Sequence, residues 1–289
     1  FDKFALTGGT HNGTVDADIT VIAIGGNVPA IGPSGVVAHN GAGAVKVTTT
    51  ADGDISNGAG DGLNVVKTGG GDITMTLDGK IEGSDDGIEA IGGMNDNIEI
   101  TLTDDVTGLG GHGIIANNYG TGALSISANG TVTGGAEDGI YANSAGPEGL
   151  TINIAESGSV STFGIDNEDW ALEADAPNGV VIVNNSGTVK GRVNLSNSNI
   201  FTNAGTWDLA GMTSNFNSQG NSLVVNEGLI IAASDGAADE VSTINNLDTF
   251  RSNAGGTIQL ADNAAGDVLR IDADAAGADG AGTGNFVVN

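Results

Sequence analysis

Acidic residues recur at one fixed place in the sequence, immediately before a glycine that opens an apolar segment. Asp61, Asp86, His112 and Asp138 occupy this place at nearly equal intervals. If the chain stacks with that period, neighbouring side chains lie one strand spacing apart, or ~4.8 Å. Carboxylates at that separation repel one another, which raises their pKa values or recruits a cation.

Calcium is the cation that such a column would recruit, because it takes carboxylate and carbonyl oxygens as ligands. The adjacent acids Asp85 and Glu137 would add ligands to those of the column. The alternative is that aspartate begins these turns because its side chain caps backbone amides. No Gly-Gly-x-Gly-x-Asp repeat of the calcium-binding kind occurs, which favours the turn explanation. The sequence predicts no required cofactor and keeps a calcium site as the second hypothesis, with the ligands Asp61, Asp85, Asp86, Glu137 and Asp138.

Aromatic side chains are the candidate contacts for a ligand. The chain has only 7 Phe, 2 Trp and 2 Tyr. Tyr141 points outward if its neighbours Ile140 and Ala142 point inward. Aromatic residues in loops on a rigid scaffold are favoured contact groups. We therefore expect ligand contacts at Tyr119, Tyr141, Phe163 and Trp170, although Phe163 and Trp170 would serve equally well to cover a distorted coil.

No catalytic constellation is recognisable in the sequence. His11, His39 and His112 occupy different positions in the repeat, and none is paired with a Gly-x-Ser-x-Gly motif. The arginines Arg192, Arg251 and Arg270 do not fall beside an acidic column that the sequence reveals. We therefore expect no enzyme, and a polysaccharide-active enzyme is kept as an alternative.

The elements that position these residues follow from an internal repeat of about 26 residues, a length typical of stacked structural units. A Gly-apolar-x-small pattern returns with this period at Gly35, Gly62, Gly87, Gly113 and Gly139. A strand of alternating apolar and polar residues follows ten or eleven residues after each glycine, and alternation of period two indicates one buried and one exposed face. A third, shorter strand follows around Ile55, Ile81, Val106, Val132 and Val160.

Three short strands per repeat bury their apolar faces when the chain coils and the coils stack. The sequence therefore predicts an all-β fold, a right-handed parallel β-helix with about three strands per coil. Glycine is expected at its corners because the chain must visit positive φ there. We divide a single solenoid, 1–289, into N-terminal coils or a cap (1–33), regular coils (34–160), an insertion (161–178) and less regular coils (179–289).

Composition narrows the class of protein. With 8 basic and 36 acidic residues the formal net charge is −28, which opposes binding to nucleic acid or anionic lipid. The absence of cysteine excludes disulfides and suits a chain exported unfolded. The sequence contains no run of about 18 apolar residues, so it predicts no membrane-spanning helix. The first ten residues lack the pattern of a signal peptide, so we expect that any such peptide has been removed or lies outside this sequence.

The chain resembles the passenger domains of bacterial autotransporters, which are exported by type V secretion and fold as β-helices. The resemblance rests on the Asp-Gly-Ile-x-Ala coils at 86–90 and 138–142 and on the Asn-x-Gly-Thr turns that begin at Asn185 and Asn203. The segments 255–260, 265–271 and 280–288 look like the part of a passenger that leads towards an autochaperone region and a translocation barrel. The barrel itself is missing, so we expect either that it was cut away or that this is another kind of exported β-helix.

The resemblance implies a secreted or cell-surface protein on the extracellular face of an outer membrane. We expect an adhesin or surface-structural protein that acts through its exposed turns. Its partners would be a host or neighbouring-cell surface protein or glycan, or copies of itself. The alternative to adhesion is a self-assembling extracellular filament or matrix protein bridged by calcium.

Overall fold

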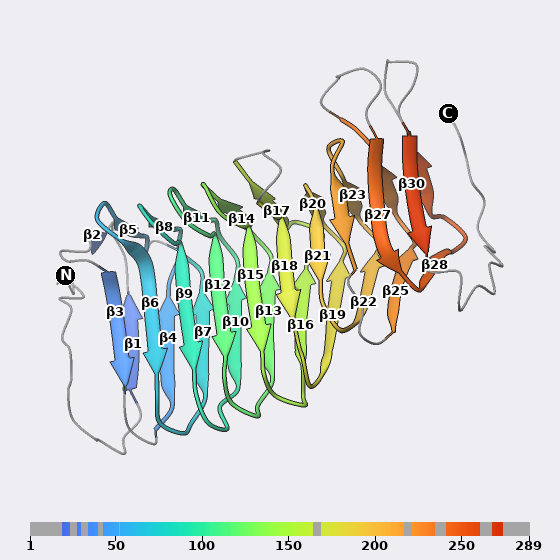
Figure 1. Cartoon of the computed structure of the whole chain (residues 1–289). Helices are drawn as coiled ribbons and strands as arrows, with labels where there is room; N and C mark the ends of the chain where they lie inside the picture. The colour runs from blue at the N-terminus through green and yellow to red at the C-terminus, as the bar shows by residue number, and fades with distance from the viewer. Residues whose placement is uncertain are drawn as a thin grey trace.

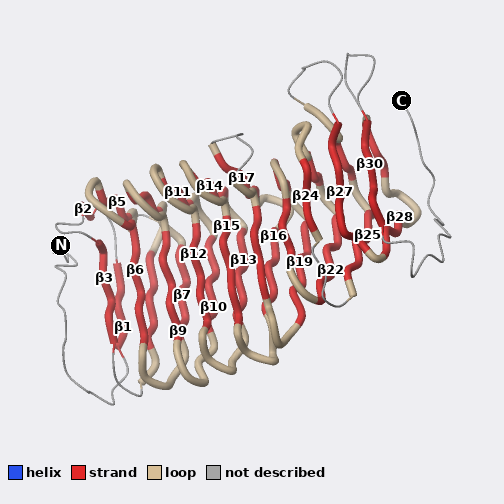
Figure 2. Tube along the Cα trace, viewed as in Figure 1, coloured by secondary structure: helices blue, strands red, loops and turns tan. Residues whose placement is uncertain are grey.

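The computed structural model describes residues 19–23, 28–29, 34–39, 43–51, 53–163, 169–216, 221–234, 241–260 and 268–273, with side chains described from residue 43 onward. The described residues form strands and turns, and none of them lies in a helix that could cross a membrane. The strands build three ten-stranded parallel sheets, and each sheet receives every third strand of the chain (Figures 1 and 2). The predicted parallel β-helix, with three strands per coil and the repeat length expected from the sequence, is confirmed.

We call the three sheets A, B and C, in the order in which the chain visits them. Sheet A consists of β1 (Ile19–Ala23), β4 (Val45–Thr49), β7 (Ile73–Leu77), β10 (Ile98–Leu102), β13 (Leu124–Ala128), β16 (Leu150–Ile154), β19 (Val180–Asn185), β22 (Ser198–Asn203), β25 (Ser222–Asn226) and β28 (Thr249–Ser252). Sheet B consists of the shorter strands β2 (Val28–Pro29), β5 (Ile55–Asn57), β8 (Ile81–Gly83), β11 (Val106–Gly108), β14 (Thr131–Gly134), β17 (Ser159–Thr162), β20 (Thr188–Lys190), β23 (Thr206–Asp208), β26 (Leu229–Ile231) and β29 (Thr257–Gln259).

Sheet C contains the strands that begin at or shortly after the residues of the acidic column. It consists of β3 (Ser34–His39), β6 (Asp61–Lys67), β9 (Ile88–Gly92), β12 (Ile114–Asn118), β15 (Ile140–Ser144), β18 (Leu172–Asp175), β21 (Val193–Leu195), β24 (Thr213–Asn215), β27 (Val241–Leu247) and β30 (Val268–Ala273). The repeated Gly-apolar-x-small segments form β3, β6, β9, β12 and β15. The alternating strands that follow form sheet A, and the short third strands form sheet B.

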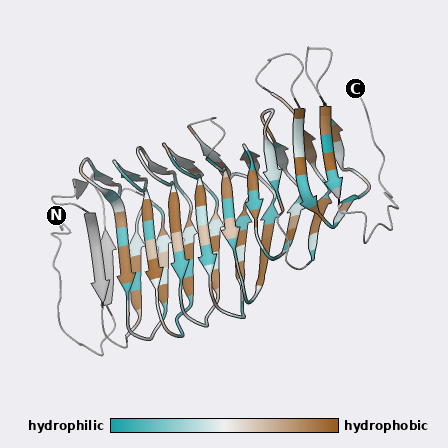
Figure 3. Ribbon diagram, viewed as in Figure 1, coloured by the Kyte–Doolittle hydropathy of each residue, from teal (hydrophilic) through white to brown (hydrophobic). Residues whose placement is uncertain are grey.

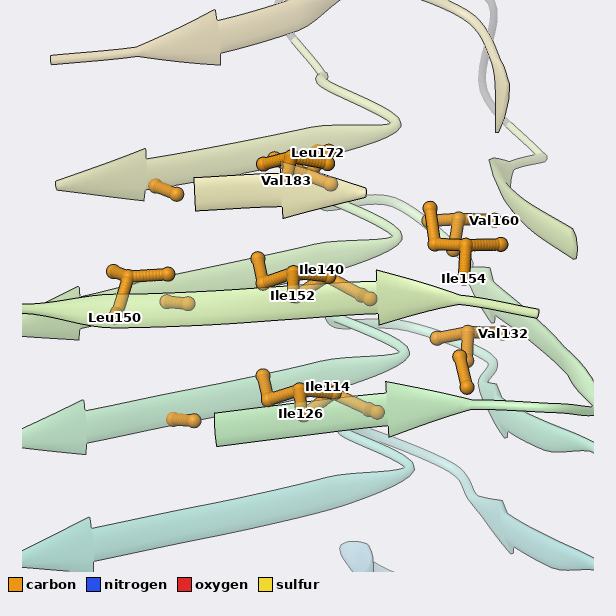
Figure 4. Packing of buried hydrophobic residues seen from close by; sticks show 14 of the residues in the cluster. Ile114, Ile126, Val132, Ile140, Leu150, Ile152, Ile154, Val160, Leu172 and Val183 are labelled. Atoms are coloured by element: carbon orange, nitrogen blue, oxygen red, sulfur yellow. The ribbon is translucent and has the colours of Figure 1, made fainter. Parts of the chain in front are cut away.

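The core is a set of aliphatic columns that run along the axis of the solenoid. Ile114 pairs in register with Ile140, and Ile140 with Leu172, so each coil adds one buried residue to the same column. Ile126 and Ile152 form the matching column in sheet A. These side chains face one another across the interior (Figure 4), and apolar and polar bands alternate along the strands (Figure 3). A strand therefore contributes only two or three inward side chains, and the stacking of many coils makes the core continuous.

The glycines that open sheet C strands are needed because the coils approach closely, and not because of positive φ. A Cβ atom at Gly113 would lie 2.6 Å from the carbonyl oxygen of Gly139 and 2.7 Å from Cγ1 of Val132. Its φ does not lie in the left-handed region, in contrast to Gly71, where φ is 120°. The expected reason, positive φ at the corners, is therefore wrong for this recurring glycine, which leaves room for the next coil.

The second half of the solenoid replaces part of the aliphatic core with a buried ladder of asparagine side chains. Asn185, Asn203 and Asn226 end successive strands of sheet A and are fully or almost fully buried. Asn185 Nδ2 donates to Asn203 Oδ1 at 2.8 Å, and Asn203 Nδ2 donates to Asn226 Oδ1 at 2.9 Å. Each amide also donates to a backbone carbonyl of the next coil. The Asn-x-Gly turns of the sequence thus hold the less regular coils in register.

The predicted insertion at 161–178 is narrower than the sequence indicated. Strand β17 extends to Thr162, and β18 returns to sheet C at Leu172, where Leu172 pairs in register with Ile140. The additional length of this coil therefore falls between β17 and β18. Of the terminal segments named above, residues 1–18 and 274–289 lie outside the described residues, while β1 and β2 place part of 19–33 in the sheets.

Candidate functional site

The acidic column forms a continuous strip at the turns that lead from sheet B into sheet C. We call this the titratable strip and define it as Asp61, Asp86, His112, Asp138 and Trp170, together with the side chains that contact them. His112 N–H donates to Asp86 Oδ1 at 2.6 Å, and Trp170 N–H donates to Asp138 Oδ1 at 2.7 Å. Asp61 Oδ1 accepts the Asp86 N–H at 3.4 Å in the same way. Each aspartate therefore caps a backbone amide of the following coil, which supports the turn explanation.

His112 bridges acids of its two neighbouring coils. Its Nδ1 lies 3.2 Å from Asp86 Oδ1, and its Nε2 lies 3.8 Å from Asp138 Oδ2 and 3.9 Å from Glu137 Oε2. Burial by itself would lower the pKa of His112, but the hydrogen bond with Asp86 and the charges of Asp86, Asp138 and Glu137 together outweigh it. The pKa of His112 is therefore raised, which favours the imidazolium between the carboxylates.

Asp138 is the acid in the strip whose protonation is most perturbed. Its side chain is buried, and burial is the main cause that raises its pKa to about 7, with repulsion from Glu173 and Glu137 contributing. The Trp170 N–H and the charge of His112 act in the opposite direction. Burial also raises the pKa of Glu173, although hydrogen bonds with Asn194 and with Asp138 partly offset this. The arrangement suits a carboxyl group on Asp138 that donates its proton to a Glu173 carboxylate.

A second group of acids lies at the N-terminal end of the strip. Asn64 Nδ2 donates to Asp61 Oδ2 at 2.8 Å and also to the carboxylate of Glu89 on the next coil. Burial raises the pKa of Glu89, and the charges of Asp61 and Asp86 raise it further. Asn64 thus supplies amide hydrogens to two carboxylates of neighbouring coils, which partly compensates for their repulsion.

The predicted calcium ligands do not converge on one point. Asp85 and Glu137 are exposed, whereas Asp61 and Asp138 are buried. Oxygen atoms of Asp61, Asp86 and Asp138 accept hydrogens from backbone amides, Asn64 or His112. Within the described parts of the chain, no group of three or more His, Asp or Glu side chains has the geometry to hold a metal ion. The strip is thus held together by hydrogen bonds and by a histidine.

The four predicted aromatic contacts fall into two pairs. Tyr141, on the outer face of β15, lies with its ring centroid 5.5 Å from that of His112, and Trp170 precedes β18, so both belong to the strip. The Arg192 guanidinium stacks over the Trp170 ring at 4.0 Å, and Arg192 Nε donates to the Asp169 carbonyl. Tyr119 and Phe163 lie outside the strip. Tyr119 lies on the turn directly after β12, and Phe163 lies on the turn directly after β17.

Three side chains of the strip were missed by the sequence argument, namely Glu89, Glu173 and Arg192. Glu89 and Glu173 occupy one column on the outer face of sheet C, together with Ile115 and Tyr141. The variable third position of the Gly-apolar-x-small pattern contained the signal for Glu89. Glu173 and Arg192 follow a coil that is longer than the repeat of about 26 residues. Their distance in the sequence from Asp138 is therefore not a multiple of the repeat, and the sequence did not place them beside it.

A second feature of the surface is a set of large apolar side chains carried on turns. Four such side chains are more than half exposed: Met94 at 66%, Leu109 at 52%, Tyr119 at 63% and Phe163 at 64%. Met94 and Tyr119 stand on neighbouring turns from sheet C to sheet A, where Thr121 N–H donates to the Met94 carbonyl. Leu109 and Phe163 stand on turns from sheet B to sheet C, two coils apart, with Gly135 on the turn between them.

In comparisons with known proteins, no family model, no curated protein and no solved structure matches this chain.

Proposed function

We propose that this chain is the exported passenger part of a bacterial autotransporter and acts at the cell surface as an adhesin or surface-structural element through its exposed turns. The observation that carries the proposal is the position of the most exposed large apolar side chains, Met94, Leu109, Tyr119 and Phe163, all of which lie on turns. Rigid stacked coils hold these turns in fixed positions, so binding costs little ordering entropy. The passenger assignment rests on the coil and turn motifs of the sequence.

The acidic composition fits this role. A formal charge of −28 keeps a repetitive β protein soluble and opposes pairing of exposed strand edges. It also disfavours nucleic acid and anionic lipid as partners. We propose a protein or glycan on a host or neighbouring cell as the partner of the turns.

Adhesion can be tested with purified chain coupled to fluorescent beads. Beads are washed over monolayers of cultured epithelial cells, and the protein is applied in parallel to an array of printed glycans. We expect the folded chain to retain beads or to bind glycans well above albumin-coated beads and above the same chain denatured before coupling. Retention equal to that of albumin on every surface would overturn the proposal.

A second candidate is a polysaccharide-active enzyme, favoured by one observation. Asp138, with a pKa of about 7, shares a hydrogen bond with Glu173 and lies beside His112, which is the kind of arrangement that exchanges protons near neutral pH. The test is release of reducing ends or unsaturated products from neutral and acidic polysaccharides by the wild type, Asp138→Asn and His112→Ala. Release that both substitutions abolish would support an enzyme, and no release from any substrate would remove this candidate.

A further inference from the structure

One of the exposed apolar side chains on the turns differs from the others in its chemistry, because it carries sulfur. The chain has 3 methionines and no cysteine, and all three methionines lie among the described residues. Met75 is fully buried and Met212 is 8% exposed, whereas Met94 is 66% exposed. Met94 is therefore the one sulfur-bearing side chain of this protein that is open to solvent in the folded state.

The backbone at Met94 is strained. This residue lies on the turn that joins β9 to β10 (Figure 1), and its φ of 58° falls in the left-handed region. On other turns from sheet C to sheet A, the left-handed positions are occupied by Gly71, Gly149 and Asn197, which are residue types that tolerate this conformation. Because the Met94 side chain is mainly exposed, packing offsets little of the strain.

The surrounding turns hold Met94 in this conformation. The Met94 carbonyl accepts the Thr121 N–H of the next coil at 2.7 Å. Two residues further on, the buried Asp96 pairs with Lys67 at 3.4 Å and accepts the Gly71 N–H of the preceding coil at 2.6 Å. These contacts join three coils and use no atom of the Met94 side chain. A chemical change of the thioether therefore leaves the hydrogen bonds of the turn in place.

We propose that Met94 is a reversible oxidation site, at which a hydroperoxide converts the thioether to a sulfoxide. One oxygen atom of hydrogen peroxide forms a bond to sulfur while the O–O bond breaks, and the hydrogen of that oxygen moves to the departing oxygen, which leaves as water. Sulfur is oxidised by two electrons and the peroxide is reduced by two. An exposed sulfoxide is also open to methionine sulfoxide reductases, which return it to the thioether.

Burial protects the other two methionines, whose oxidation would harm the fold. Met75 pairs in register with Val47 and Ile100 on the inner face of sheet A, and all three side chains are buried. A sulfoxide oxygen there would be a buried polar group without a hydrogen-bond partner, which is destabilising. Oxidation of Met94 places the same oxygen in water. The fold thus confines oxidation to a position that the solenoid tolerates.

The test is exposure of the folded full chain to hydrogen peroxide, followed by peptide mass spectrometry at successive times. We expect Met94 to gain one oxygen atom at least about tenfold faster than Met75 and Met212, and all three to react at similar rates in the chain unfolded by urea. The sulfoxide at Met94 should leave the melting temperature within about 2 °C of its original value. A pair of methionine sulfoxide reductases should then remove the added oxygen.

Met94→Leu should abolish the fast uptake of oxygen, while the matched control Met212→Leu should leave it unchanged, with both variants folded by circular dichroism. Equal rates at the three methionines of the folded wild type would overturn the inference. So would fast uptake that survives in Met94→Leu, a clear fall in melting temperature on oxidation of Met94, or a sulfoxide that the reductases do not remove.

Oxidation of Met94 should also weaken adhesion, a consequence that rests on the proposed function. Met94 and Tyr119 are exposed on neighbouring turns, and a sulfoxide makes this part of the contact surface polar. On a surface that retains wild-type beads, oxidised wild type should bind at least about fivefold more weakly, because a polar group without a partner would be buried in the contact. Oxidised Met94→Leu should bind as before.

The two proposals fail in different ways. Wild-type beads that are not retained before oxidation would overturn adhesion alone, because the uptake of oxygen at Met94 is measured by mass. Equal retention of the two oxidised forms would overturn the effect of oxidation on the contact surface.

Discussion

His112 and Asp138, on neighbouring coils, face each other with the imidazole Nε2 3.8 Å from the carboxyl Oδ2. Both groups have a raised pKa in the folded chain, which for Asp138 reaches about 7. A group with a raised folded pKa binds its proton more tightly in the folded state than in the unfolded state. The free energy of unfolding should therefore fall as pH rises, for Asp138 between its ordinary value of 3.8 and about 7.

The first prediction concerns Asp138→Asn. Asparagine keeps an oxygen for the Trp170 N–H but does not ionise, so the variant should gain about 2 kcal/mol over wild type at pH 8 and little at pH 4. Chemical denaturation at both pH values measures this difference. The control is Asp105→Asn, an exposed acid that accepts the Thr131 N–H in the same manner. An equal gain at pH 8 in the control would assign the effect to net charge and contradict the role of burial.

The second prediction concerns the centre of the asparagine ladder. Asn203→Ala removes the oxygen that accepts from Asn185 Nδ2 and the N–H that donates to Asn226 Oδ1. One buried N–H of Asn185 and the buried Asn226 Oδ1 lose these bonds, while both amides keep their bonds to backbone carbonyls. Such groups cost about 1 to 3 kcal/mol each, so the variant should lose at least about 2 kcal/mol of stability. Asn184→Ala, which removes an exposed amide bonded to Asn153, should change stability by less than about 0.5 kcal/mol. Equal losses in the two variants, measured by urea unfolding, would show that the ladder contributes nothing beyond a surface contact.

The third prediction concerns the close approach of coils at Gly113. Gly113→Ala places a methyl group 2.6 Å from the Gly139 carbonyl oxygen, so the coils must separate, and we expect a loss of at least about 2 kcal/mol. Gly58→Ala adds a methyl group with nothing within 4 Å and should be neutral or slightly stabilising. Melting temperatures of the two variants compare them directly. A harmless Gly113→Ala would mean that glycine is not required for stacking.

The fourth prediction concerns the buried ion pair between Lys67 and Asp96, whose atoms lie 3.4 Å apart with both side chains fully buried. Lys67→Met fills similar space but leaves the Asp96 carboxylate buried without its cation, at a cost of about 3 kcal/mol. Lys67→Met combined with Asp96→Asn should recover part of that loss. Urea unfolding of the single and double variants measures the recovery, and a double variant less stable than the single one would contradict this account.

The regular half of the fold was predictable because its signals are local. Ile98–Leu102 and Ile73–Leu77 alternate with period two, and the glycine before each sheet C strand marks the coil, so strands and register follow from counting. The strip was predictable only where successive coils have nearly equal length. Asp86, His112 and Asp138 share one interval, whereas Glu173 follows a longer coil and was reached only through its pairing with Tyr141.

Other features could not be read from the sequence because they depend on the register of irregular coils. Ile182, Ile200 and Leu223 are separated by unequal intervals that match no constant repeat, yet they form one outward column. Because these intervals are unequal, the sequence does not show which Asn side chains contact one another inside the solenoid. The spacing of residues in the sequence therefore predicts contacts between coils of equal length. In the irregular coils, hydrogen-bonded ladders of side chains determine which residues are in contact.

The central proposal is that the exposed apolar side chains on the turns, and not the titratable strip, make the contacts of this protein. It is tested most directly by bead retention on epithelial monolayers and on printed glycans for three forms of the chain. These forms are the wild type, a turn variant with Tyr119→Ser and Phe163→Ser, and a strip variant with Asp138→Asn. We predict that retention falls to the albumin level in the turn variant and is unchanged in the strip variant, with both folded by circular dichroism. Full retention by the turn variant, or its loss in the strip variant alone, would contradict the account.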